Sequence, residues 1–324
     1  MCNHLCWVPS FFTGRVGPRQ NADRNNAGRM LLILLATVLW LAAPPGCGPD
    51  SEPTPADALS QKIGPDRGTI TIEKPGNPLN GLSIDVPPKA YPEGATLAVS
   101  SRAYDGERSE SFHPISPVIH VEGGKAFAEE IVKVTVPIEL PEGMFAMGFF
   151  VHGDGELEPM PLANLTDRSI TVATRHFSEF IIGAIPEMKL KGKISTGFKP
   201  GRDDWHFANR GSYISPGGHC AGQSITAAWY YWERKKALGE PALSGRYDNN
   251  GNTPTPDLWQ DDTRAYRLAS TVQQDLNFST DLRKFFNALG DTSSPLTWKA
   301  FLYSMHLTGE PQYVPVWDTD SKGG

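Results

Sequence analysis

The sequence predicts a multidomain protein: an all-β antiparallel sandwich followed by an α+β domain in which helices predominate. Its 324 residues correspond to about two domains of ordinary size. Apolar residues alternate with a period of two over residues 67–185, which is typical of short strands. Beyond residue 186 the composition changes, because six of the eight Trp lie there and helical spacing replaces alternation.

Composition excludes several classes of protein. With 39% apolar residues and eight Trp the chain is too hydrophobic for a disordered protein, and its formal net charge of -6 argues against a nucleic-acid partner. The four cysteines, at positions 2, 6, 47 and 220, form no CxxC pair and no His/Cys cluster with metal-ligand spacing. We therefore expect no disulfide scaffold, no metal and no cofactor.

Residues 1–47 are predicted to be an export signal. An apolar run over residues 30–43 follows four arginines and is closed by Pro44, Pro45, Gly46 and Cys47. A basic flank on one side only predicts that the rest of the chain crosses the membrane. The run ending in Gly46 and Cys47 resembles a bacterial lipoprotein signal, which implies lipidation of Cys47 and an exported protein anchored in the cell envelope. A simple cleaved signal or a retained anchor is the alternative.

The segment after Cys47, residues 48–66, is predicted to be a linker. It contains Pro49, Pro53 and Pro55 and almost no large apolar residue. Such a composition favours an extended tether that holds the folded part away from the membrane.

Residues 67–185 are predicted to form the β-sandwich. Gly, Pro, Asn or Asp separate the alternating segments, and no convincing helical pattern lies between them. Residues 81–90 (GLSIDVPPKA) and 176–180 (HFSEF) resemble the ZU5-like β-sandwich of ankyrins and bacterial surface proteins. The resemblance implies a module for protein interaction or spacing, and it supplies no catalytic residue. We expect ordinary surface or core roles for His113, His120, His152 and His176.

Residues 186–324 contain the candidate chemistry, centred on Cys220. A tight turn at residues 215–218 leads into a helix with Ile225, Ala228, Trp229 and Trp232 on one face and a stop at Gly239. A thiol in the first turn of a helix lies beside free backbone N–H groups, which favour the thiolate and can also bind an oxyanion. The sequence therefore predicts a nucleophile at Cys220, with a buried structural thiol as the alternative.

This arrangement resembles the papain-like cysteine peptidase superfamily, especially its bacterial C39-like branch, in which the nucleophilic Cys opens a long helix after a Gly-containing turn. Helices are expected over residues 263–276 and 297–307, then a strand over 312–317. In the family, a following Gly-His-Ala type strand delivers the catalytic His. The chain stops before such a strand, so the domain is expected to be C-terminally incomplete.

The catalytic partners of Cys220 have no match in the sequence. A papain-like site also needs a His and a Gln that serves as oxyanion donor before the Cys. His306 is expected on a helix, and His219 is expected to point away from its neighbour, so neither is assigned to catalysis. Asn209 and Gln223 are the polar amides near Cys220, and neither is assigned.

Two functions follow from the sequence. The first is a membrane-tethered envelope protein with a candidate cysteine peptidase domain, inactive as written because the catalytic His is missing. The alternative is a noncatalytic binding or structural lipoprotein of the envelope. In both cases the lipid anchor connects the protein to the membrane, and a peptide or protein is the expected partner.

Overall fold

The computed structural model describes residues 59–124, 127–153, 155–247, 263–278, 280–290 and 292–314. The predicted export signal, the lipidation site at Cys47 and residues 48–58 of the predicted linker lie outside these ranges. So do residues 315–317 of the predicted last strand. No helix in the described ranges has the length and apolar character needed to cross a bilayer.

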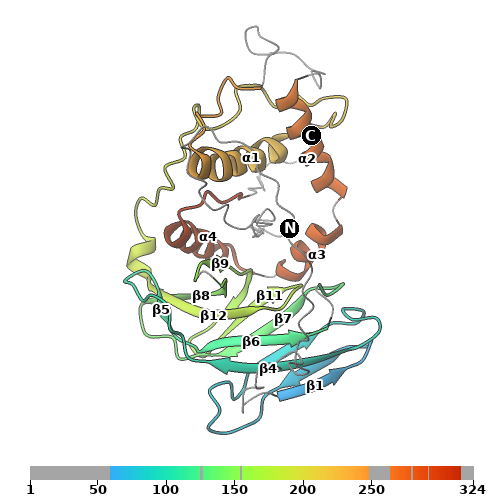
Figure 1. Ribbon diagram of the computed structural model, residues 1–324, viewed down its shortest axis with the longest axis vertical. Coiled ribbons are helices and arrows are strands. Elements are labelled where there is room, and N and C mark those ends of the chain that lie inside the picture. Colours follow the sequence, from blue (N-terminus) through green and yellow to red (C-terminus); the bar gives the residue numbers. More distant parts are fainter. Residues whose placement is uncertain are drawn as a thin grey trace, which may run out of the picture.

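Two antiparallel sheets build the β-rich part, as the alternation predicts (Figure 1). The seven-stranded sheet has the order β1-β4-β6-β12-β8-β9, with β5 paired to β12, and the five-stranded sheet has the order β10-β11-β7-β3-β2. Apolar side chains from both sheets form one core, in which Leu97, Val134 and Val172 are fully buried. The strands are β1 (Leu59–Ile63), β2 (Gly68–Thr71), β3 (Ser83–Val86), β4 (Ala95–Arg102), β5 (His113–Pro114), β6 (Val118–Gly123), β7 (Val132–Pro137), β8 (Met144–Val151), β9 (Leu157–Pro159), β10 (Leu162–Leu165), β11 (Ser169–Thr174) and β12 (Glu179–Pro186).

The first strand lies inside the segment predicted as a linker. β1 pairs with β4 in antiparallel register from Leu59 opposite Val99 to Ile63 opposite Ala95. Four of its five side chains are exposed and only Ile63 is buried, so the segment lacks the apolar alternation on which the prediction depended. β1 is held in the sheet by backbone hydrogen bonds to β4 and is the outermost strand. Within the described residues the sheet therefore begins at Leu59 and not at residue 67.

Within the described ranges the helical part contains four α-helices, the first of which has an extension. α1 (Cys220–Trp229) continues as a π-helical segment (Tyr230–Lys236), and it is followed by α2 (Arg264–Phe278), α3 (Thr280–Leu289) and α4 (Ser294–Thr308). The stop at Gly239 is confirmed, since this residue has a φ of +69° and its N–H donates to the Lys235 carbonyl. α3 was not predicted. The predicted strand over 312–317 is wrong for residues 312–314, which have no regular secondary structure.

Two helices pack directly on the sandwich (Figure 1). On α4, Tyr303 is fully buried, and its ring meets the rings of Phe145 and Phe149 of β8 edge-on at 6.2 and 5.2 Å. The opposite face of β8 points to the other sheet, because a Cβ at Gly148 would lie 2.7 Å from a methyl of Val172. β8 is therefore buried on both faces, and the sandwich and the helices share one core across residue 186.

Candidate functional site

Cys220 is the first residue of α1 and is exposed to solvent. The buried structural thiol that the sequence left open is therefore wrong. Ser224 lies one turn further along α1, and its hydroxyl group donates a hydrogen bond to the Cys220 carbonyl oxygen at 2.9 Å. The thiol thus lies at the accessible amino end of a helix, which is the position that the Gly-rich turn predicted.

The turn before Cys220 is held by its own hydrogen bonds. Ser215 donates its hydroxyl to the Gly218 carbonyl at 2.6 Å, and the Ser212 hydroxyl accepts the Ser215 N–H at 3.0 Å. Ser212 in turn donates to Ser270 of α2 at 2.7 Å. Asn209 accepts the N–H of His219 through its Oδ1 at 2.6 Å. The position of Cys220 is therefore fixed by residues on both sides of the turn.

α2 crosses α1 at a close contact beside the thiol. A Cβ at Gly222 would lie 1.9 Å from the Ala269 carbonyl oxygen, so only glycine fits here. The contact brings Gln273 of α2 to the start of α1, where its Oε1 accepts the N–H groups of Ala221 at 2.9 Å and Gly222 at 3.2 Å. Gln273 is therefore the amino-terminal cap of α1, supplied from another helix.

This cap changes the expected oxyanion site. Two of the first-turn N–H groups that the sequence offered to an oxyanion already donate to Gln273. The N–H of Cys220 has no acceptor within the described chain. Gln223 is also occupied, since its amide donates to the Phe207 carbonyl at 2.9 Å. Among the described residues, the donors left at this end of α1 are the Cys220 N–H and the exposed Asn209 amide.

The two histidines considered for Cys220 are both engaged elsewhere. The His219 ring is fully buried and lies against Tyr266 at 5.0 Å and Phe207 at 5.6 Å. His306 lies on α4, with its Nε2 2.9 Å from the Ser111 hydroxyl of the sandwich. Within the described ranges no group of three or more His, Cys, Asp or Glu side chains is arranged to hold a metal ion.

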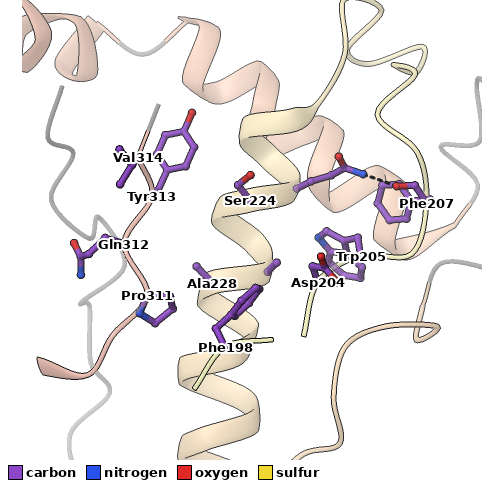
Figure 2. A pocket seen from close by; sticks show the side chains of 12 residues that line it. Phe198, Asp204, Trp205, Phe207, Ser224, Ala228, Pro311, Gln312, Tyr313 and Val314 are labelled. Atoms are coloured by element: carbon purple, nitrogen blue, oxygen red, sulfur yellow. Dashed lines mark hydrogen bonds between the residues drawn. The ribbon is translucent and has the colours of Figure 1, made fainter. Parts of the chain in front are cut away.

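A groove with a volume of about 470 Å³ runs along α1 (Figure 2). Its floor is the α1 face that carries Ser224, Ala227 and Ala228, and this face begins one turn after Cys220. The remaining lining comes from the loop before the turn and from the segment after α4. These residues are Phe198, Asp204, Trp205, Phe207, Gln223, Pro311, Gln312, Tyr313 and Val314.

Tyr313 connects the groove to the thiol. Figure 2 shows its ring on the groove wall, with the hydroxyl directed toward the amino end of α1. Burial raises the pKa of Tyr313, and electrostatic interaction with Cys220 raises that pKa further. The phenol therefore stays protonated at neutral pH, close enough to the sulfur for an electrostatic interaction.

Sequence reasoning missed Gln273 and Tyr313. Gln273 lies on a polar stretch of α2 and is 53 positions away from Cys220, so no local spacing connects the two. The small residues Gly222 and Thr226 on the buried face of α1 were the available signal for a close helix contact. Tyr313 lies in a segment that was expected to be a strand, and its alternation gave no indication of the groove.

No family model matches this chain, and no curated protein matches it either.

Proposed function

We propose that this chain is an exported envelope protein, tethered through a lipid on Cys47, whose helical part binds a peptide and offers Cys220 to it as a nucleophile. One observation supports the proposal above all others: Cys220 is exposed at the first position of α1, and a groove begins one turn further along the same helix. Backbone N–H groups at the start of a helix favour a thiolate. A groove of about 470 Å³ is large enough for side chains of a bound peptide.

The proposed chemistry is addition of the thiolate to a peptide carbonyl: the S–C bond forms, the C=O π bond breaks and the negative charge moves to the oxygen. The adduct reverts by expelling the thiolate, because no described residue is assigned as proton donor to the leaving amine. The Cys220 N–H and the Asn209 amide are the donors that we assign to the resulting oxyanion. Asn209 suits this role because its Oδ1 is fixed by the His219 N–H, which leaves the exposed amide nitrogen available. In this proposal the sandwich is a ZU5-like spacer or interaction module that holds the helical part away from the membrane.

A noncatalytic binding protein is the second candidate function. The positions of His219 and His306 favour it, because one ring is enclosed by aromatic side chains and the other is hydrogen-bonded to the sandwich. Release of an amine from a thiol adduct needs a proton donor, which an imidazole usually supplies. Under this alternative the groove binds a peptide without cleaving it.

A peptide carrying an electrophile distinguishes the two functions. The full chain is treated at pH 7 with a peptide vinyl sulfone, and the adduct is located by peptide mapping and mass spectrometry. The proposal predicts modification of Cys220 at about ten times the rate of free cysteine or faster. The Cys220→Ser variant must lose this adduct, and free cysteine in the same buffer supplies the reference rate. Labelling no faster than free cysteine would leave the binding function.

The anchor is tested separately. Expression in a bacterium fed with labelled palmitate should give a labelled, membrane-associated protein. The Cys47→Ala variant should lose the label and should be released from the membrane fraction. Retention of the label in that variant would exclude lipidation at Cys47.

A further inference from the structure

Among the described side chains that line the groove, one is charged. Asp204 is that residue, and the other lining residues are aromatic, aliphatic or neutral polar. Its Oδ1 accepts the Gly201 N–H at 2.8 Å, and within the described chain no Lys or Arg forms an ion pair with it. Asp204 therefore keeps its second carboxylate oxygen, Oδ2, as an acceptor for a ligand in the groove that it lines.

The neighbouring residue shows what a structural carboxylate looks like in this loop. Asp203 is 1% exposed, accepts the Lys199 N–H at 2.9 Å and forms an ion pair with Lys235. This ion pair holds the loop against the π-helical continuation of α1, which contains Lys235. Lys235 is therefore already neutralised by Asp203. The negative charge of Asp204 is not used in this ion pair and can interact with a ligand in the groove.

Aromatic rings form the wall around Asp204 (Figure 2). Three of them are fixed by contacts outside the groove. Trp205 donates its indole N–H to the Thr226 hydroxyl at 2.8 Å, Phe198 packs edge-on against Tyr231 at 5.3 Å, and Phe207 lies 4.3 Å from the ring of Tyr266. The rings are therefore positioned before any ligand arrives, and binding does not have to order them.

Aromatic faces together with one carboxylate select for a cation. The negative faces of the rings attract ammonium and guanidinium groups, and they also pack against the methylene stem of a long basic side chain. A carboxylate adds a charge-assisted hydrogen bond. An acidic ligand would be repelled by Asp204, and a purely apolar ligand would leave that carboxylate desolvated and unpaired.

We propose that the groove along α1 binds the Lys or Arg side chain of a peptide, with its charged group on Asp204 and its stem against Phe198, Trp205 and Phe207. This rests on the proposed function and specifies the substrate class for that site. Cys220 lies on the same helix, one turn before the groove floor begins at Ser224. A Lys or Arg bound in the groove would therefore determine which neighbouring part of the peptide lies next to the thiol.

Binding measurements on the full chain with Cys220→Ser test this proposal without interference from the reaction. The ligands are blocked tetrapeptides that differ only in one residue: Arg, Lys, norleucine or Glu. Isothermal titration should give an affinity for the Arg and Lys peptides that is about ten times that for the norleucine peptide, with the Glu peptide weakest. Asp204→Asn should abolish the difference between Arg and norleucine.

Two further variants make the result decisive. Asp275→Asn removes an exposed carboxylate of α2 that does not line the groove, and the preference for Arg should survive it. Asp204→Glu keeps the charge and should keep part of the preference, provided that circular dichroism shows an intact fold. Equal affinity for Arg and norleucine, a preference that survives Asp204→Asn, or no binding by any peptide would overturn the proposal. Since the assay uses the Ser variant, such a failure leaves the labelling test of Cys220 unaffected.

Discussion

At the scale of single residues, the reactivity of Cys220 depends on how the first-turn amides of α1 are used. Gln273 takes two of them through one neutral oxygen, and the Cys220 N–H keeps its capacity to donate. A neutral cap satisfies the helix end and adds no charge beside the sulfur, so it does not oppose a thiolate electrostatically. The cap is therefore compatible with a thiolate at this position.

The Gln273→Glu variant tests this use of the amides. The substitution keeps the shape and the acceptor oxygen but places a negative charge at the start of α1, which opposes the thiolate. We expect alkylation of Cys220 at pH 7 to slow by about two- to fivefold, corresponding to a charge–helix interaction of about 0.3–1 kcal/mol. Gln274→Glu adds the same charge one position further along α2 and serves as the control. Equal rates for the two variants would show that Gln273 does not influence the sulfur.

At the scale of elements, the site depends on the close contact between α1 and α2. Gly222 is the residue that permits it, since an added methyl group would meet the backbone of α2 at Ala269. Backbone cannot move aside as a flexible side chain can, so the helices must separate. Separation would also withdraw Gln273 from the amino end of α1.

The Gly222→Ala variant is therefore expected to destabilise the protein, although Ala is the better helix former. Overpacking of this kind costs about 1–3 kcal/mol or more. Gly217→Ala is the matched control, because nothing lies within 4 Å of its Cβ position and its φ is not positive. Urea unfolding of both variants measures the difference. A Gly222→Ala protein as stable as the control would contradict the contact.

An ion pair between strands predicts how stability depends on pH. Arg102 of β4 reaches across β6 and donates two hydrogen bonds to Glu179 of β12, at 2.9 and 2.7 Å. These hydrogen bonds hold the pKa of Glu179 below its ordinary value. A carboxyl with a lowered pKa in the folded state stabilises the fold above its unfolded pKa, and this contribution is lost as the pH falls through the lowered value.

We expect Glu179→Gln to cost about 0.5–1 kcal/mol at pH 7, because the pair is partly exposed. The cost should shrink as the pH falls below about 4.5. Arg102→Gln should give a similar loss, and the double variant should lose little more than either single one. Urea unfolding at pH 7 and pH 3 checks this. Additive losses would show that the two residues act independently.

At the scale of the whole molecule, α3 and α4 join the helical part to the sandwich. Phe285 and Leu289 of α3 pack with Ile131 and Ala173 of the sandwich, and Tyr303 of α4 lies on β8. A lysine of α4, Lys299, also pairs with Glu187 at the end of the sandwich at 2.6 Å. The two parts therefore depend on each other, and we expect unfolding to be one cooperative event.

Tyr303 tests this cooperativity. The Tyr303→Ala variant should lose about 3–5 kcal/mol of stability, because a fully buried aromatic ring leaves a cavity between α4 and β8. Fluorescence of the Trp-rich helical part and far-ultraviolet circular dichroism of the sheets should report the same shifted transition. Two separate transitions in the wild-type protein would contradict a shared core.

The Tyr303→Phe variant is the complementary control. The Tyr303 hydroxyl is buried and has no hydrogen-bond partner among the described residues, so its removal should be neutral or stabilising. Burial raises the pKa of Tyr303, so the wild-type protein should lose stability as the pH rises above about 10, and the Phe variant should lose less. A large loss of stability at pH 7 would show that the hydroxyl has a partner.

The sheets, the start of α1 and its stop at Gly239 could be predicted because period and turn chemistry are local properties. The packing of the helices could not. The alternation of Phe145 and Phe149 in β8 predicted one buried face, and the sequence contained nothing to show that α4 would cover it. On α1 the predicted face, with Ile225 and Trp229, is only half-buried. The fully buried face carries Gly222 and Thr226, whose small or polar side chains have no hydrophobic periodicity.

The most direct test of the account is the rate at which iodoacetamide alkylates Cys220 in the full chain at pH 7, with the same chain unfolded in urea as reference. Folding places the sulfur at the amino end of α1, so we predict alkylation about ten times faster in the folded protein. Mass mapping of the Cys220 peptide separates this site from the other three cysteines. A rate in the folded chain that equals or falls below the unfolded rate would show that the helix does not activate the thiol and would contradict the proposed nucleophile.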